Sequence, residues 1–384
     1  MAKKNIDIEC LRAVAILLTA LQHLNVLFRW SPHPLGRIED YLHFWGGVDL
    51  FFCISGYVVS KSLIESLDVA RGEGREWLVV KAFWTRRVYR LLPSAWLWMI
   101  IMGAGTFLFN ETGAFGNVHD TISRSIAIVT GVANFATFFG INMGQGFVYW
   151  SLALEEQFYL IFPFFVVFVP IAWRHRVLLL AIAIQFPMYR STGTIFWATR
   201  LDALLWGIVL YLFSRTPQYR IFEPLSLKKS SKAWGVSLFL IFTLAAIPGA
   251  LETVPFHVGM MALASAALVY AASFNKAYVL PSRWLRPILT WIGSRSYAIY
   301  LCHLPAYMIT HELWTRWTER FGLSHPNGTY TIRYAITALA LITALAELNY
   351  RLVEAPLRKR GMNAARRITL QPSAASDQMT VSRP

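Results

Sequence analysis

Residues 11–25 read LRAVAILLTALQHLN, an apolar stretch suited to a membrane-crossing helix that nevertheless carries Arg12 and His23. Eleven residues make about three turns of an α-helix, so these two side chains project from the same face. They are separated by about 16 Å along the axis, because each residue rises about 1.5 Å. The stretch therefore predicts a helix with Arg12 at one membrane interface and His23 beyond the midplane.

The composition of the chain is that of a membrane protein with several spans. Of its 384 residues, 56% are hydrophobic and only 15% are charged, whereas soluble domains carry about 25% charged residues. The net charge of +15 gathers in loops beside apolar segments, which follows the positive-inside rule and argues against nucleic-acid binding. The polar start MAKKNIDIEC does not resemble a cleavable signal peptide. We expect Cys10, Cys53 and Cys302 to be free thiols, without a disulfide framework or a metal site.

Eleven apolar segments follow one another along the chain. They cover residues 11–29, 44–60, 91–109, 122–140, 148–170, 177–189, 194–213, 234–250, 257–274, 291–310 and 330–350. Crossing a bilayer as a helix takes about 20 such residues, and several of the segments meet this length. The fold class that they predict is an all-α integral membrane protein.

Basic residues between these segments predict the topology, because loops rich in Lys and Arg stay in the cytoplasm. Such residues occur in both terminal tails, in the 61–90 loop and at 173–176, whereas loop 110–121 has none. Both termini are then cytoplasmic, which requires an even number of spans. Only one crossing fits between loop 110–121 and residues 173–176, so we expect segment 122–140 to be re-entrant or to lie in the outer interface. The prediction is about ten transmembrane helices.

The domain organisation that follows is simple. We expect one polytopic membrane domain over residues 1–360. The remaining residues, 361–384, are polar and contain several serines, which is typical of a disordered cytoplasmic tail.

Titratable side chains inside the expected spans are the candidates for function. Burying them in lipid is costly unless they face the bundle interior or a water-filled cavity. The predicted topology places six of them in the outer half of the membrane: His23, Asp49, Glu155, Glu156, Arg200 and Asp202. Their convergence at one depth indicates a site.

A second group of candidates lies at the cytoplasmic interface. The stretch TRRVYRLLP contains Arg86, Arg87 and Arg90, of which Arg87 and Arg90 share a helix face. His303, in SYAIYLCHLP, lies in the outer part of its own span.

Each candidate also has a purely structural interpretation. His23 could form an interhelical hydrogen bond, and Arg12 could extend to the lipid headgroups. The three arginines of TRRVYRLLP could serve only as topology signals. Arg200 and Asp202 could pair with each other.

Seven motifs occur in order along the chain: LRAVAILLTALQH, GGVDLFFCISGY, RRVYRLLP, WSLALEEQFYLIFP, RLDALLWG, IGSRSYAIYLCHLP and YRLVEAPLR. Together they resemble the acyltransferase family 3 membrane proteins, bacterial enzymes that O-acylate cell-surface carbohydrates. The resemblance runs from Ile6 to Arg358. Family members often carry Asp-Gly directly before the Leu-Arg of the first motif, where this chain has Glu9 and Cys10.

The resemblance implies an acyl-CoA donor, expected to be acetyl-CoA, and a carbohydrate acceptor such as O-antigen or exopolysaccharide. It also implies the bacterial cytoplasmic (inner) membrane as the location, with no permanently bound cofactor. Guanidinium groups bind phosphate bidentately, so Arg87 and Arg90 could hold the CoA phosphates, with Arg86 as a secondary contributor. Arg12 lies at the same interface and could guide the pantetheine arm inward.

His23 is the candidate general base of such a reaction. An acceptor hydroxyl must lose its proton as it attacks the thioester carbonyl, and imidazole is suited to this task near neutral pH. Glu155 or Glu156 could orient the imidazole, and only one of these adjacent residues can face a given cavity. A covalent acyl-enzyme, on Cys53 or Cys302 or on a histidine, is an alternative route.

Five residues are candidates for binding the acceptor: Asp49, Trp150, Arg200, Asp202 and His303. Arg200 is also a candidate for stabilising the oxyanion, and an aromatic cavity near Trp150 would suit a sugar ring. Most of the Trp and Tyr residues are better explained as membrane-interface anchors.

A proton-coupled transporter is the competing function, because intramembrane His, Glu, Asp and Arg also form ion pathways. The sequence shows no inverted repeat of the kind found in many secondary transporters.

Overall fold

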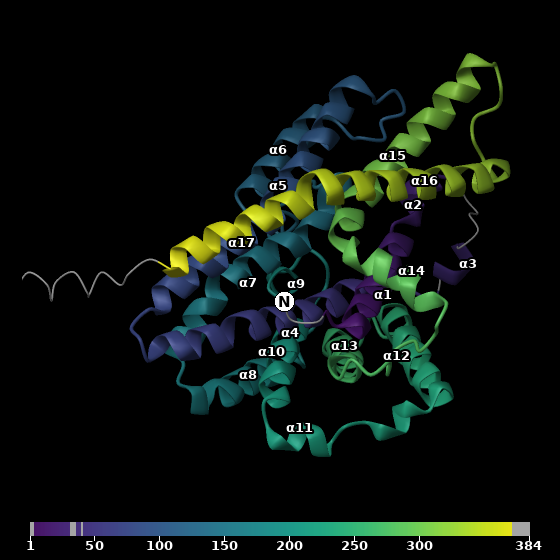
Figure 1. Cartoon of the computed structure of the whole chain (residues 1–384). Coiled ribbons are helices and arrows are strands. Elements are labelled where there is room, and N and C mark those ends of the chain that lie inside the picture. The colour runs from purple at the N-terminus through teal and green to yellow at the C-terminus, as the bar shows by residue number, and fades with distance from the viewer. Residues whose placement is uncertain (1–3, 31–35, 40, 371–384) are drawn as a thin grey trace, which may run out of the picture.

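The computed structural model describes residues 4–30, 36–39 and 41–370, and every regular element within them is a helix (Figure 1). The longer helices are α1 (Ile6–Gln22), α4 (Gly46–Arg71), α5 (Glu76–Leu108), α6 (Val118–Val129), α7 (Tyr149–Phe168), α8 (Ile171–Gln185), α10 (Asp202–Ser214), α12 (Ser230–Ala250), α13 (His257–Ser273), α14 (Leu285–Ser294), α15 (Ser296–Arg320), α16 (Thr331–Asn349) and α17 (Ala355–Leu370). The short ones are α2 (Leu24–Leu27), α3 (Gly36–Glu39), η1 (Gly144–Val148), α9 (Ile195–Ala198), α11 (Pro217–Ile221), η2 (Leu225–Lys228), η3 (Gly328–Tyr330) and the π-helical turn η4 (Tyr350–Glu354).

Six helical stretches of the described chain are long and apolar enough to cross a membrane. They are Gly46–Arg71, Glu76–Leu108, Gly144–Phe168, Ile195–Ser214, Ser230–Ala250 and Gly328–Leu370. Helices α1, α8 and α13 coincide with further expected spans but have only 17, 15 and 17 residues. The all-helical architecture is thus as predicted for the described residues, and its composition is that of a membrane protein.

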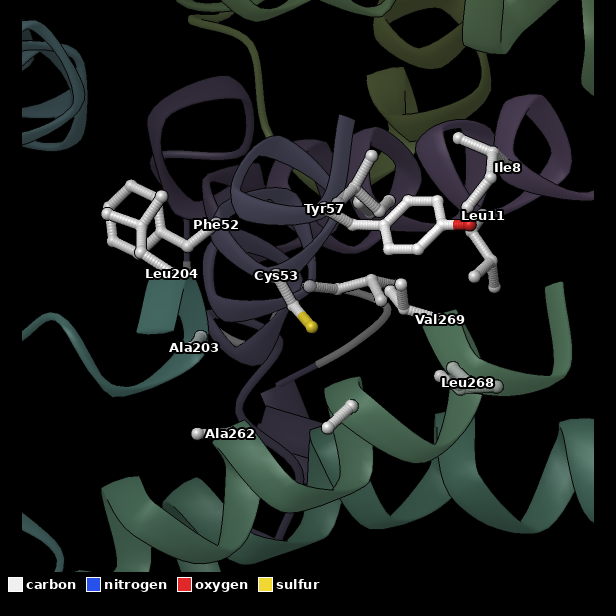
Figure 2. Close-up of a cluster of buried hydrophobic side chains, with 14 of the residues drawn as sticks. Ile8, Leu11, Phe52, Cys53, Tyr57, Ala203, Leu204, Ala262, Leu268 and Val269 are labelled. Atoms are coloured by element: carbon white, nitrogen blue, oxygen red, sulfur yellow. The ribbon is translucent and has the colours of Figure 1, made fainter. Parts of the chain in front are cut away.

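Helix α4 forms the centre of the bundle and packs against α1, α10 and α13. Figure 2 shows Cys53 and Tyr57 of α4 among side chains of these three neighbours, including Leu11, Leu204 and Val269. All five side chains are buried. A helix enclosed by neighbours can be apolar all round, which explains why GGVDLFFCISGYVV shows no polar face.

Helices α4 and α10 approach each other closely because glycines meet where they cross. A Cβ atom added to Gly207 would lie 2.2 Å from the carbonyl oxygen of Cys53 and 2.6 Å from the backbone nitrogen of Tyr57. A Cβ added to Gly56 would lie 2.1 Å from the carbonyl oxygen of Leu204. Small residues allow such contact within a membrane, where van der Waals packing holds helices together.

We expect Gly207→Ala to destabilise the protein strongly, because the two helix backbones must separate to admit the methyl group. Overpacking costs about 1–3 kcal/mol where the surroundings yield, and backbone atoms yield less than side chains. The measurement is the unfolding midpoint in detergent, compared with that of Gly235→Ala in α12, where an added Cβ meets nothing within 4 Å. Equal midpoints for the two variants would contradict this close crossing.

The 61–90 region, expected as a cytoplasmic loop, is mostly helical. Helix α4 continues to Arg71 and α5 begins at Glu76, so only a short turn separates them. Leu, Lys, Glu and Arg are strong helix formers, so a helix can continue after its apolar pattern ends. The arginines of TRRVYRLLP consequently belong to α5 itself.

Segment 122–140 does not form one long helix. Helix α6 ends at Val129, and turns occupy most of residues 130–140. Its 12 residues rise about 18 Å, less than the ~30 Å of a hydrocarbon core. This form agrees with the expectation that the segment does not cross the membrane as a single helix.

The carboxyl-terminal helices α16 and α17 lie end to end across the bundle, joined by η4 (Figure 1). Residues 361–370, expected to begin a disordered tail, are helical and belong to α17. Polar residues on this helix face outward while Gly361 packs against Tyr89 of α5, so a low apolar content did not prevent helix formation. Residues 371–384 of the expected tail lie outside the described residues.

Candidate active site

Three cavities follow one another through the described part of the bundle. The end cavity, of about 200 Å³, is lined by charged residues that include Lys4, Glu9, Arg12, Arg90 and Glu354. The arginine cavity, of about 80 Å³, is lined by residues that include Arg12, Arg87, Arg90, Ser55, Glu155 and Tyr159. The histidine cavity, of about 300 Å³, is lined by residues that include His23, Trp45, Trp150, Trp197 and Tyr300.

Shared side chains connect these cavities into a series. Arg12 and Arg90 line both the end cavity and the arginine cavity. Val48 and Tyr300 line both the arginine cavity and the histidine cavity. The three cavities thus form a series beside α1, from a basic end to His23, and side chains separate each from the next.

Helix α1 positions the two residues that first indicated a site. The side chain of Asn5 accepts a hydrogen bond from the backbone N–H of Ile8 and so fixes the start of the helix. Arg12 lines the arginine cavity and donates to Glu9 over 3.3 Å. His23 caps the other end of α1 and lines the histidine cavity. Their shared helix face, predicted from the spacing, is therefore the face along which the cavities lie.

His23 has a partner that the sequence did not indicate. Its Nδ1 lies 3.1 Å from Nε2 of His303, a buried residue of α15. The expected pairing of His23 with Glu155 or Glu156 is therefore wrong. Helix α15 packs against α1 and brings His303 to His23, which is a tertiary contact that no local pattern encodes.

The adjacent residues Glu155 and Glu156 face different cavities. Glu155 lines the arginine cavity and accepts hydrogen bonds from Ser55 and Tyr159. Glu156 lines a side cavity of about 410 Å³, whose other lining residues include Trp84. Of the two carboxylates, Glu155 alone belongs to the series of three cavities.

Two of the three predicted arginines of α5 reach the arginine cavity. The guanidinium of Arg87 stands 5.3 Å and 5.0 Å from the ring centroids of Phe83 and Tyr159. The Nε atoms of Arg87 and Arg90 are buried and have no hydrogen-bond partner among the described residues. Arg86 lines none of the three cavities. Free donors on two neighbouring guanidinium groups are suited to an anionic ligand.

Two buried ion pairs support the wall of the histidine cavity. Arg200 lies 3.3 Å from Asp49, and Arg190 pairs with Asp202. The suggested pair of Arg200 with Asp202 is therefore wrong, because each has a different partner. The sequence did not indicate Arg190, since it lies outside the apolar segments, in the irregular connection between α8 and α9.

Arg200 is enclosed by three tryptophans that line the histidine cavity. Its guanidinium carbon lies 3.9 Å, 4.6 Å and 4.9 Å from the ring centroids of Trp197, Trp150 and Trp45. Cation–π contacts of this kind hold the rings in place.

Only Trp150 among the five acceptor candidates lines the cavity. The other four, Asp49, Arg200, Asp202 and His303, are buried and line none of the three cavities. They are placed to support the wall, so direct contact of Arg200 with an oxyanion has no support here. The sequence did not single out several other residues that line this cavity, among them Gln22, Asn25, Trp45, Tyr189, Arg190, Trp197, Glu252 and His257.

The three cysteines, Cys10, Cys53 and Cys302, are free and buried. None lines the end, arginine or histidine cavity. An acyl-cysteine route through Cys53 or Cys302 therefore has no support in the described geometry.

These features define a helical membrane protein with a series of internal cavities that ends at a histidine. The model of the acyltransferase domain that defines acyltransferase family 3 matches residues 5–347, and the chain belongs to this family.

The chain is 28% identical over 386 residues to the peptidoglycan O-acetyltransferase OatA of Listeria monocytogenes, covering 92% of this chain and 56% of that relative. It is also 28% identical over 386 residues to the O-acetyltransferase OatA of Staphylococcus aureus, covering 93% and 58%. The chain thus spans less than two thirds of the length of these curated relatives. No solved structure matches the chain.

Proposed function

We propose that this protein transfers an acetyl group from acetyl-CoA to a hydroxyl of a cell-surface carbohydrate. The series of three cavities carries the proposal, because it joins a basic end suited to phosphates with a histidine in an aromatic chamber. The names of two relatives, both O-acetyltransferases and one acting on peptidoglycan, support it.

The membrane arrangement that suits this reaction has about ten spans, with both termini in the cytoplasm of a bacterial cell. The end cavity then faces the cytoplasm, where CoA is found, and the histidine cavity faces the opposite side. In the end cavity, the CoA phosphates would meet the basic side chains of Lys4, Arg12 and Arg90. The narrow arginine cavity would hold the pantetheine arm.

In the histidine cavity, the aromatic rings of Trp45, Trp150 and Trp197 provide a surface for a sugar ring. His23 Nε2 takes the proton of the acceptor hydroxyl as its oxygen bonds to the acyl carbonyl carbon. The carbon–sulfur bond then breaks, and the CoA thiolate leaves with the proton that His23 gives back. The products are an ester and free CoA, so the imidazole ends as it began.

The test uses membranes that contain the protein, with labelled acetyl-CoA and the cell's own surface polysaccharide. We expect the label in ester linkage to the polysaccharide, released by mild base, and absent from membranes without the protein. A proton-coupled transporter would instead move a solute in response to a pH gradient and leave no covalent label. Solute movement without covalent labelling would show that the protein is a transporter and would contradict the proposed acetyl transfer.

The double variant Arg87→Ala/Arg90→Ala tests the donor end. Both guanidinium groups line the arginine cavity, and Arg90 also lines the end cavity. A hydrogen bond to a charged group contributes about 1.5–3 kcal/mol, so losing one donor contact from each arginine should raise the KM for acetyl-CoA at least about 100-fold. The rate at saturating donor should change much less, because the reacting atoms lie in the next cavity. Arg86→Ala is the matched control, since Arg86 is adjacent but lines none of the three cavities. If the double variant keeps the original KM for acetyl-CoA, as Arg86→Ala should, then Arg87 and Arg90 are topology signals and do not bind the donor.

A further inference from the structure

The contact between His23 and His303 supports an inference about which nitrogen of His23 reacts. We propose that His303 is a positioning residue that holds His23 as its Nδ1–H tautomer, with the lone pair of Nε2 directed to the histidine cavity. This inference rests on the proposed role of His23 as general base.

The protonation of His303 follows from its neighbours. Its Nδ1 lies 2.7 Å from the carbonyl oxygen of Tyr300 and 3.2 Å from that of Ile299. Carbonyl oxygens only accept hydrogen bonds, so His303 Nδ1 must carry a hydrogen and donate it. Neutral imidazole has one such hydrogen, and therefore His303 Nε2 carries a lone pair and accepts.

The protonation of His23 follows from that of His303. His23 Nδ1 lies 3.1 Å from His303 Nε2, and one of the two atoms must donate. Because His303 Nε2 accepts, His23 Nδ1 carries the hydrogen and His23 Nε2 is left with its lone pair. The two nitrogens point to different sides of the ring, so a bond from Nδ1 to buried His303 turns Nε2 away from α15. His23 lines the histidine cavity, where an acceptor hydroxyl would lie.

The backbone carbonyl of Thr19 also lies within hydrogen-bond reach of the His23 ring, but neither motif glutamate shares the task of His303. Glu155 is held by Ser55 and Tyr159 in the arginine cavity, and Glu156 faces the side cavity. A neutral imidazole thus stands where many hydrolases place a carboxylate beside their base. When His23 gains the proton of the hydroxyl at Nε2, its Nδ1–H bond to His303 is retained, so the ring does not have to turn during the reaction.

Two variants of equal length separate positioning from packing. The side-chain oxygen of His303→Gln can still accept from His23 Nδ1, whereas the side chain of His303→Met fills similar space without an equivalent acceptor. We expect His303→Met to lower kcat about 10- to 100-fold with little change in the KM for acetyl-CoA, and His303→Gln to retain most of kcat. Equal kcat values for the two variants would overturn the inference.

A spectroscopic measurement tests the inference without substrate. The full chain, labelled with ¹⁵N-histidine in lipid bilayers, gives ring-nitrogen signals for nine histidines, and His23→Gln identifies those of His23. We expect the Nδ1–H tautomer for His23 in the original protein and in His303→Gln, and a mixture or the Nε2–H tautomer in His303→Met. An Nε2–H tautomer in the original protein, or an unchanged tautomer in His303→Met, would overturn the inference. A protein that shows the expected tautomers but transfers no acetyl group would contradict the proposed function alone.

Discussion

Replacing His23 by alanine is expected to lower the rate of acetyl transfer by about 10²- to 10⁴-fold, the usual contribution of general acid–base catalysis. The imidazole lines the histidine cavity, and Glu155 is engaged with Ser55 and Tyr159 in the neighbouring arginine cavity. Glu155 is therefore not placed to take over the proton, and the other titratable side chains that line this cavity, Glu252 and His257, belong to its α12–α13 wall rather than to α1. The measurement is the rate of labelled acetyl transfer at saturating acetyl-CoA.

Two further variants make this result specific. His23→Gln keeps a polar side chain of similar size and should be as slow as His23→Ala, because an amide cannot act as a base at neutral pH. His119→Ala removes a histidine in the first turn of α6 whose side chain is 90% exposed, and it should retain the full rate. A His23→Ala protein that keeps more than a tenth of the rate would exclude His23 as the base.

Replacing Asp49 by alanine is expected to cost about 3–5 kcal/mol of stability, because it leaves the charge of Arg200 buried and unpaired. Both residues are almost fully buried. Other hydrogen bonds do not compensate for the lost ion pair, since Nε and Nη1 of Arg200 already lack hydrogen-bond partners among the described residues. Loss of the ion pair should also loosen the three tryptophans around the guanidinium. The unfolding midpoint and tryptophan fluorescence of the purified protein measure the two effects.

Two control variants test whether the loss of stability in Asp49→Ala comes from leaving a buried charge unpaired. Arg351→Ala breaks an exposed ion pair with Glu347, which should cost at most about 1 kcal/mol. Asp49→Ala combined with Arg200→Met removes both buried charges and should recover part of the loss, because apolar residues can replace a buried pair at little cost. A single Asp49→Ala variant as stable as Arg351→Ala would show that the ion pair does not hold this wall.

Local periodicity was sufficient to predict how α1 presents its two candidate site residues. Arg12 and His23 are three turns apart, and helix geometry alone places them on one face. The partner of His23 was not predictable in the same way, because His303 is 280 residues away in the sequence and meets it only through the packing of α15 against α1. The expectation that a glutamate of another motif would pair with His23 could not anticipate this contact, which depends on tertiary packing.

The ion pairs illustrate a related difficulty. Arg200 and Asp202 are two positions apart in the sequence. The chain enters α10 between them, and their side chains take different directions. Their partners, Asp49 and Arg190, come from α4 and from the connection between α8 and α9. Helix ends were also missed, because the charged residues of 61–90 end the apolar pattern without ending the helices. Sequence periodicity thus predicted the apolar middle of each helix better than its ends or its neighbours.

The burial of all three native cysteines has a practical consequence. Thiols that are covered on every side react slowly with water-soluble maleimides, so the unmodified protein should give little background labelling. One new cysteine in the turn between α4 and α5, and another beside His119, would then be the fast-reacting positions in their respective variants. Labelling each from one side of a sealed vesicle would map the orientation of the chain without first removing any native residue.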